Sequence, residues 1–242
     1  MFNMFDIIAL DADDTLWHNE PLYTKTQEKF CQLLKPYHDL EWIHKRLNET
    51  EIRNLEIFGY GVKGFILSMI ETAIELSESR ISGREIQEII NLGRQMLQAP
   101  IELLDHVKET IPRLSRLYPL MLITKGDLFD QETKIARSGL ADCFKHVEIV
   151  SEKTTEVYHA ILKKYRFPPK RFLMVGNSLK SDILPVLAIG GQAVFIKYPT
   201  TWAHEAVDET EVKRAGYFEI DHIGEIFELL ENLQKGRVFE SG

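Results

Sequence analysis

The stretch Ile7-Ile8-Ala9-Leu10-Asp11-Ala12-Asp13-Asp14-Thr15-Leu16-Trp17 changes abruptly from apolar to acidic. Its apolar start predicts a buried strand, and three of the next four residues are aspartates. Open α/β sheets build their sites at the carboxyl ends of strands. Clustered carboxylates repel one another unless a cation lies among them, and oxygen ligands suit a hard cation such as Mg²⁺. The stretch therefore indicates a metal-assisted carboxylate site. The alternative is an Asp-rich turn in which Asp14 or Thr15 caps a helix.

The composition limits the classes of protein that this chain can belong to. Its 242 residues, 44% of them apolar and 27% charged, are typical of a soluble globular protein with one domain or one domain plus an insertion. The formal net charge of −8 disfavours nonspecific binding to nucleic acid or anionic membranes, but it allows a small phosphorylated substrate. Cys31 and Cys143 indicate neither a disulfide framework nor a zinc site. Because the sequence shows no signal-like N-terminus and no long apolar stretch, we expect a cytoplasmic protein. We expect it to be a monomer or a homodimer.

Short apolar runs alternate with helical patterns along much of the chain. The expected strands are Phe5–Leu10, Pro119–Ile123, Val147–Val150, Phe172–Val175 and Ala193–Ile196. The expected helices between the later strands are Leu128–Ser138, Thr154–Tyr165 and Leu179–Ile189. Strands that alternate with helices predict βαβ units, and therefore a doubly wound α/β fold with a parallel, Rossmann-like sheet.

A long helical interval interrupts this alternation. The interval from Leu16 to Pro119 is about three times longer than the roughly 30 residues of an ordinary βαβ unit. Its helical patterns cover Tyr23–Leu34, Leu40–Phe58, Val62–Leu76 and Arg84–Gln98. We expect an all-helical cap at 17–100, inserted into a catalytic core formed by 1–16 and 101–242. Such an insertion lies where a lid would cover the strand ends, although a long crossover packed on the sheet is the alternative.

Four segments carry motifs that recur in one known family. Asp11–Thr15 match Asp-x-Asp-x-Thr, and Ile123–Gly126 form an apolar strand that ends in Thr. Lys153 stands in Ser151–Thr154, and Val175–Ile183 resembles Gly-Asp-Ser-x-x-x-Asp. In this order they resemble the motifs of the haloacid dehalogenase-like (HAD) superfamily, and the insertion resembles its C1-type cap. The resemblance implies a Mg²⁺-dependent phosphatase of the nucleotidase and small-metabolite branch, acting on a small phosphorylated metabolite.

The same resemblance assigns roles to individual residues. Asp11 would be the nucleophile that forms an aspartyl-phosphate, and Asp13 would protonate the leaving oxygen and later deprotonate water. Thr124 would bind a phosphoryl oxygen, and Lys153 would hold the nucleophile and the phosphate by its charge. The expected phosphate-binding residues are Asp14, Thr124, Lys125, Gly126 and Lys153. The expected metal ligands are Asp11, Asp13, Asn177 and Asp182.

Asn177 departs from the family pattern, which usually has Asp at this position. An amide oxygen can ligate Mg²⁺ but brings no charge. Asp182 then becomes the more important anionic partner, either as a ligand or as the residue that holds water or Lys153. Asn177 is also the one feature that favours a catalytically weak binding or regulatory protein.

Two other enzymes of the superfamily are alternatives. A 2-haloacid dehalogenase is disfavoured by Asp13, because that reaction needs no acid two residues after the nucleophile. A phosphomutase would use the same residues as a phosphatase. Within the insertion, Phe58–Phe65 either faces the substrate or joins two helices, and Arg53 and Lys63 are candidate substrate contacts.

Overall fold

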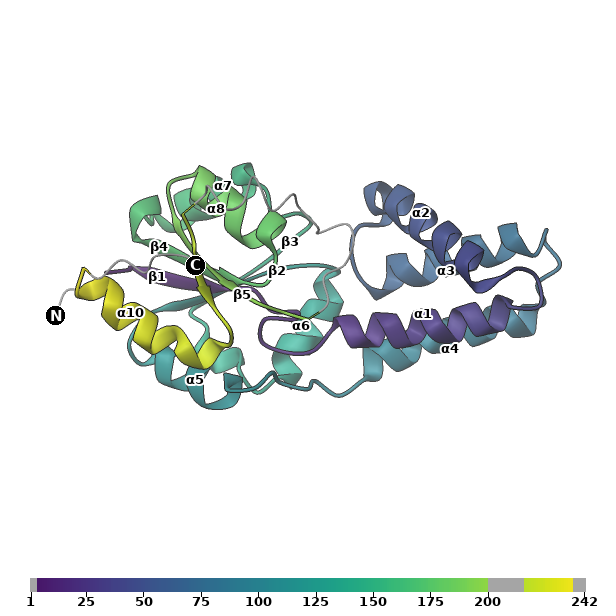
Figure 1. Cartoon of the computed structure of the whole chain (residues 1–242), viewed down its shortest axis with the longest axis horizontal. Helices are drawn as coiled ribbons and strands as arrows, with labels where there is room; N and C mark the ends of the chain where they lie inside the picture. Colours follow the sequence, from purple (N-terminus) through teal and green to yellow (C-terminus); the bar gives the residue numbers. More distant parts are fainter. Residues whose placement is uncertain (1–3, 200–215, 237–242) are drawn as a thin grey trace. The chain divides into compact units, whose positions relative to one another are not determined.

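A computed structural model describes residues 4–199 and 216–236 of the chain (Figure 1). The chain divides into two compact units. Residues 1–18, 101–125 and 134–242 form one, which we call the α/β unit. Residues 19–100 and 126–133 form the other, which we call the helical unit. The helical unit differs from the expected cap at residues 17–18, which group with the α/β unit, and at the additional segment 126–133.

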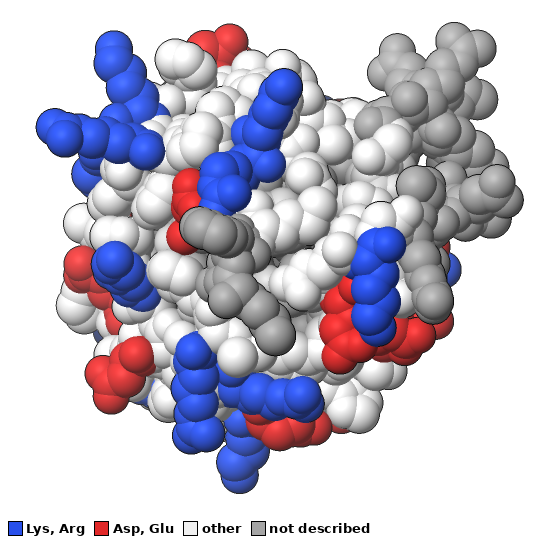
Figure 2. Space-filling view, turned by 90° about the vertical axis from the view of Figure 1, so that its left-hand side faces the viewer, with Lys and Arg blue, Asp and Glu red and all other residues white. Residues whose placement is uncertain are grey.

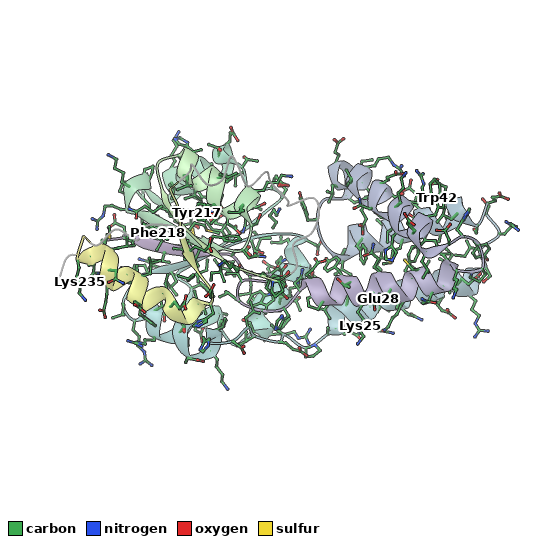
Figure 3. The ribbon with its side chains drawn as sticks, in the orientation of Figure 1. Lys25, Glu28, Trp42, Tyr217, Phe218 and Lys235 are labelled. Carbon is green, nitrogen blue, oxygen red and sulfur yellow. The ribbon has the colours of Figure 1, made fainter. Side chains whose placement is uncertain are left out.

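Six parallel strands form one sheet in the described part of the α/β unit, as the predicted fold class requires. Their order across the sheet is β3-β2-β1-β4-β5-β6. The strands are β1 (Ile7–Leu10), β2 (Leu120–Lys125), β3 (His146–Val150), β4 (Phe172–Gly176), β5 (Gln192–Ile196) and β6 (Phe218–Ile220). The sequence predicted the first five with slightly different ends, and it missed the short edge strand β6. Figure 3 labels Tyr217 and Phe218 there, and the Tyr217 ring packs edge-on against Phe195.

Helices cover both faces of the sheet (Figure 1). They are α5 (Val107–Ser115), α7 (Thr155–Tyr165), α8 (Leu184–Ala188) and α10 (Ile226–Gln234), whereas α6 (Leu128–Arg137) begins in the helical unit and ends in the α/β unit. Successive strand residues point to opposite faces. Ile8 and Leu10 accordingly pack with α5 and α10, whereas Ile7 and Ala9 pack with α7 and α8. Because both faces are covered, the central strands β1 and β4 are buried and apolar along their whole length.

The helical unit has its own apolar core. Its long helices are α1 (Glu20–Leu34), α2 (Leu40–Phe58), α3 (Val62–Leu76) and α4 (Gly83–Gln98), and α2 and α3 have the predicted bounds. Phe30, Leu47 and Met69 are among the side chains buried between them. The exposed side chains include Lys25 and Glu28 on α1 and Trp42 on α2 (Figure 3), and some apolar ones such as Ile57. The described helices are too short or too polar to span a membrane.

Three details of the helices depart from the sequence-based prediction. The expected helix Leu179–Ile189 begins as a π-helical turn, Leu179–Ile183, before α8 continues it. Helix α5 was not predicted, because Pro112 lies inside it and proline normally breaks a helix. Helix α10 was not predicted either, although its buried apolar residues recur at helical spacing.

The sheet changes its winding direction between β1 and β4, the two central strands. From β1 the chain adds β2 and β3 on one side, and it then adds β4, β5 and β6 on the other. Leu10 pairs with Val175 across these two central strands. The residues that follow each strand, Asp11 and Asn177, therefore lie at the topological switch point, where open α/β sheets bind their ligands.

Candidate active site

Four neighbouring strands bring the expected site residues to one edge of the sheet. Asp11 follows β1, Thr124 lies near the end of β2, Lys153 comes shortly after β3, and Asn177 follows β4. The backbone N–H of Asp11 donates to the carbonyl oxygen of Val175 at 2.9 Å, which continues the β1–β4 pairing into the site. The motifs that are scattered along the sequence thus meet because parallel strands end at the same edge.

Lys153 is the centre of a buried ion cluster. Its ammonium nitrogen lies 2.5 Å from Oδ1 of Asp11 and 2.6 Å from Oδ1 of Asp182. The side chains of Lys153 and Asp182 are only 2% and 1% exposed, so solvent screens these pairs little. The other oxygen of Asp182 accepts from the backbone N–H of Ser178 at 3.0 Å. Asp182 therefore acts as a fixed anchor for Lys153 in this structure.

A glycine makes room for this anchor. A Cβ atom on Gly176 would lie 2.3 Å from Oδ2 of Asp182 and 2.7 Å from its Cβ. Real Cβ atoms do not approach other atoms so closely. The glycine of the fourth motif is thus required by the packing of Asp182 against the end of β4.

The charges of the cluster do not balance. The two carboxylates together raise the pKa of Lys153 above its usual value, even though burial opposes its charge. Burial, together with the charge of Asp182, raises the pKa of Asp11 to about 7, although Lys153 opposes both effects. Two carboxylates that share one ammonium carry a net charge of −1 when both are ionised. A cation placed beside Asp11 would therefore be favoured.

Thr15 links the nucleophile candidate to Asn177. Its hydroxyl oxygen lies 3.0 Å from Oδ2 of Asp11 and 3.1 Å from the amide oxygen of Asn177. A hydroxyl has one proton, so it can donate to only one of these oxygens at a time. With the Asn177 amide turned over, its N–H₂ group would donate to Thr15 while Thr15 donates to Asp11. That arrangement satisfies all three groups and leaves the Asn177 oxygen pointing away from Thr15.

The expected metal ligands are only partly brought together. Within residues 4–199 and 216–236, no three His, Cys, Asp or Glu side chains are placed to hold a metal ion as a group. Asp11 and Asn177 lie side by side on Thr15, whereas Asp182 is bound to Lys153 and Asp13 has partners of its own. The remaining donors are all oxygens, and Mg²⁺ usually takes one or two carboxylates and keeps several waters. The donor set of Asp11 and Asn177 fits such a sparsely held Mg²⁺.

Asp13 is bound by two residues outside the expected site. The indole N–H of Trp17 donates to its Oδ1 at 2.7 Å. The ammonium group of Lys134 lies 3.1 Å from each of its oxygens. Trp17 stands only four positions after Asp13, so its contact with Asp13 could have been considered from the sequence alone. The Lys134 contact joins residues 121 positions apart, and no sequence pattern indicated it.

The expected phosphate-binding residues have different surroundings. Thr124 is buried at the end of β2. The ammonium of Lys125 donates to the Ser181 hydroxyl at 2.9 Å and lies 3.7 Å from Glu152. Asp14 is buried in the turn after β1 and has a φ of 60°.

The remaining expected residues belong to the helical unit. Gly126 has a φ of +143°, a conformation that favours glycine. The two candidate substrate contacts have carboxylate partners, Arg53 with Glu71 at 2.7 Å and Lys63 with Asp127 at 2.8 Å.

Charged side chains on the outer surface follow no single sign. Figure 2 shows acidic and basic residues interspersed on one face, with uncharged surface between them. The formal net charge of −8 is therefore not expressed there as a uniformly acidic surface. A ligand at the strand ends is therefore affected mainly by the charged side chains there, and less by the net charge of the whole chain.

Known proteins resemble this chain over most of its length. The family model described as haloacid dehalogenase-like hydrolase matches residues 5–190. The 5-amino-6-(5-phospho-D-ribitylamino)uracil phosphatase YigB of Escherichia coli is 24% identical over 229 residues, which cover 86% of this chain and 92% of that protein. The glyceraldehyde 3-phosphate phosphatase of Pyrococcus furiosus is 30% identical over 130 residues, which cover 51% of this chain and 52% of that protein.

Solved structures agree with the fold. A haloacid dehalogenase-like family hydrolase from Xanthomonas campestris is 41% identical, with a TM-score of 0.83, and the match covers 97% of this chain and 94% of that one. The HAD hydrolase YfnB of Bacillus subtilis, solved with bound magnesium, has a TM-score of 0.66 at 15% identity, over 94% of this chain and 99% of that one. At this low identity the second likeness bears on the fold alone.

Proposed function

The chain belongs to the haloacid dehalogenase-like hydrolase family, and we propose that it is a Mg²⁺-dependent phosphatase that hydrolyses a small phosphate monoester through an aspartyl-phosphate on Asp11. The observation that carries the proposal is the buried cluster in which Lys153 joins Asp11 to Asp182 at the switch point of the sheet. The relatives named as phosphatases of small phosphorylated metabolites support the choice of phosphate ester chemistry.

The first half-reaction transfers the phosphoryl group to the protein. A carboxylate oxygen of Asp11 forms a bond to phosphorus while the bond from phosphorus to the leaving oxygen breaks. Asp13 gives its proton to that leaving oxygen, so the alcohol departs uncharged. The ammonium of Lys153 would offset part of the charge on the phosphoryl oxygens, and the hydroxyl of Thr124 would donate a hydrogen bond to one of them.

The second half-reaction returns the protein to its starting state. Asp13, now ionised, takes a proton from a water molecule as that water attacks phosphorus. The bond between phosphorus and Asp11 breaks, which releases inorganic phosphate and restores the carboxylate. Asp11 and Asn177 would hold Mg²⁺. When bound, it supplies a Lewis acid that neutralises phosphoryl charge and favours the ionised form of Asp11.

The substrate class follows from the same proposal. A monoester dianion needs compensating charge, and the Lys153 ammonium together with a Mg²⁺ held by Asp11 and Asn177 would supply it locally in a chain of net negative charge. We expect a sugar phosphate, a nucleotide or a similar metabolite. The protein would then have a small phosphorylated metabolite as its partner, with the α/β core supplying the chemistry.

The nucleophile assignment is tested by Asp11→Asn. The substitution should lower phosphate release from p-nitrophenyl phosphate with Mg²⁺ by on the order of 10³-fold or more, because an amide cannot form the acyl phosphate. Asp105→Asn, which changes an exposed acid of the same unit, is the matched control and should retain activity. Near-normal turnover by a folded Asp11→Asn protein would contradict the assignment. Chloride release from chloroacetate without metal would favour a dehalogenase instead.

A further inference from the structure

Trp17 holds the carboxylate of Asp13 from four positions along the chain. Its indole nitrogen donates to Oδ1 of Asp13 at 2.7 Å, and its side chain is buried in the core of the α/β unit. The backbone around it is fixed as well. The carbonyl of Trp17 accepts from the N–H of Asp14 at 2.7 Å, and Trp17 forms an antiparallel bridge with Leu103. The indole is therefore a rigid donor aimed at one oxygen of Asp13.

The chemistry asked of Asp13 needs such a donor. A group that first gives a proton and then takes one back must keep its orientation in both protonation states. The indole N–H carries no charge and cannot accept, so it can bond to Oδ1 whether or not Oδ2 carries a proton. The ammonium of Lys134, 3.1 Å from both oxygens, is suited to the ionised carboxylate. Of these two contacts, only that of Trp17 suits both half-reactions.

We propose that Trp17 is a positioning residue of the reaction, which directs Oδ2 of Asp13 toward the leaving oxygen of the substrate. The proposal rests on the proposed function, because it assigns Trp17 an effect on the acid step that Asp13 performs. A purely structural role for Trp17 would instead require only that its ring fill the core and that its N–H find an acceptor.

The two roles differ in how the loss depends on the leaving group. The kcat/KM value reports the steps up to the aspartyl-phosphate. In that half-reaction an alkyl oxygen needs a proton in order to leave, whereas p-nitrophenolate is stable without one. In Trp17→Phe we expect kcat/KM for glycerol 3-phosphate to fall by about 10- to 100-fold, and that for p-nitrophenyl phosphate by less than about threefold. Trp42→Phe, on the exposed face of α2, is the control and should change neither value.

A double mutant and an isosteric variant complete the test. Adding Trp17→Phe to Asp13→Asn should cause no further loss, since Trp17 acts through Asp13. If Trp17→Phe fails to fold, benzothienylalanine at position 17 keeps the bicyclic shape, removes the N–H and should give the same preference between the two esters. In a protein that is active, two results would overturn the role of Trp17. One is an equal loss of kcat/KM on both esters, and the other is full additivity of the two losses in the double mutant. A wild-type protein that releases no phosphate from either ester would overturn the proposed function itself, and the role of Trp17 with it.

Discussion

At the scale of single residues, the site depends on one buried lysine whose ammonium group forms ion pairs with two carboxylates. Lys153 contacts both Asp11 and Asp182, while Asn177 contributes dipoles rather than a charge. A carboxylate at position 177 would add a second net negative charge beside the nucleophile. The asparagine therefore lowers the attraction for a divalent cation without removing an oxygen donor.

Asn177→Asp should tighten the binding of Mg²⁺. An anionic ligand attracts a hard cation more strongly than an amide does, so the Mg²⁺ concentration for half-maximal activity should fall by roughly three- to tenfold. The turnover number carries no such expectation, because tighter metal binding need not favour the transition state over the ground state. Asn177→Ala is the comparison and should raise the half-maximal concentration. If neither variant moves it, Asn177 does not contact the metal.

Gly176→Ala should inactivate the protein by displacing Asp182. The added methyl group would lie 2.3 Å from Oδ2 of Asp182, so the anchor of Lys153 has to shift. We expect a loss of about 1–3 kcal/mol in the free energy of unfolding, with at least about tenfold lower kcat. Urea denaturation and phosphate release measure the two effects. Gly83→Ala, at a position with open space around it, is the control and should leave kcat unchanged.

The sequence analysis singled out Asp11, Lys153 and Asp182 because they match motifs of the haloacid dehalogenase-like superfamily. The structure places these three side chains in contact, and their roles stay a prediction. The contacts of Lys134 with Asp13 and of Lys125 with Ser181 could not be predicted, since they join residues that only the folded sheet brings together. The sequence motifs indicate which carboxylates lie at the strand ends. Which side chains bind those carboxylates depends on the packing of the folded protein.

At the scale of secondary structure, a proline explains why the helix after β4 begins with a wider turn. Pro185 has no N–H, so it cannot donate to the carbonyl of Ser181 four residues earlier. That carbonyl accepts from the hydroxyl of Tyr158 at 3.0 Å instead. The preceding residues form π-type bonds, including one from Leu184 to the carbonyl of Leu179. The hydrophobic periodicity predicted a helix here, but it carries no information on which carbonyls lose their partners.

Glu51 on α2 should make the stability of the helical unit depend on pH. Burial raises its pKa to about 8, and Glu20 adds repulsion. A carboxyl whose pKa is higher in the folded state stabilises the fold below its unfolded value, near 4.5, and this contribution is lost as the pH rises through 8. Glu51→Gln should therefore stabilise the protein more at pH 9 than at pH 5, by on the order of 1–2 kcal/mol.

Thermal unfolding at pH 5, 7 and 9 measures this difference. The control is Glu56→Gln, which changes an exposed residue of the same helix and should give the same small shift at every pH. A gain from Glu51→Gln that is equal at pH 5 and pH 9 would show that ionised Glu51 costs the fold nothing.

At the scale of the whole molecule, the apolar cores and the charged site are separate features. Two apolar clusters pack on the two faces of the sheet, and a third lies within the helical unit. The sequence predicted this division from hydrophobic periodicity, which is strongest where a strand or helix is buried along its length. It missed β6 and α5, which are short or interrupted by proline, because their patterns resemble those of loops, and it also missed α10.

Removal of the metal should therefore abolish activity without unfolding the protein. The apolar clusters contain none of the proposed ligands, so the cores do not depend on the metal. Lys153 already lies between Asp11 and Asp182, and its charge reduces the repulsion between the two carboxylates when Mg²⁺ is removed. We expect EDTA to eliminate phosphate release and excess Mg²⁺ to restore it, while the circular dichroism spectrum is unchanged. The melting temperature should fall by only about 1–3 °C, as the stabilisation lost is that of one weakly held ligand. Persistent activity in EDTA would contradict a Mg²⁺-dependent reaction. Cooperative unfolding in EDTA would show instead that the metal is part of the fold, and that Lys153 alone does not compensate the charge of Asp11.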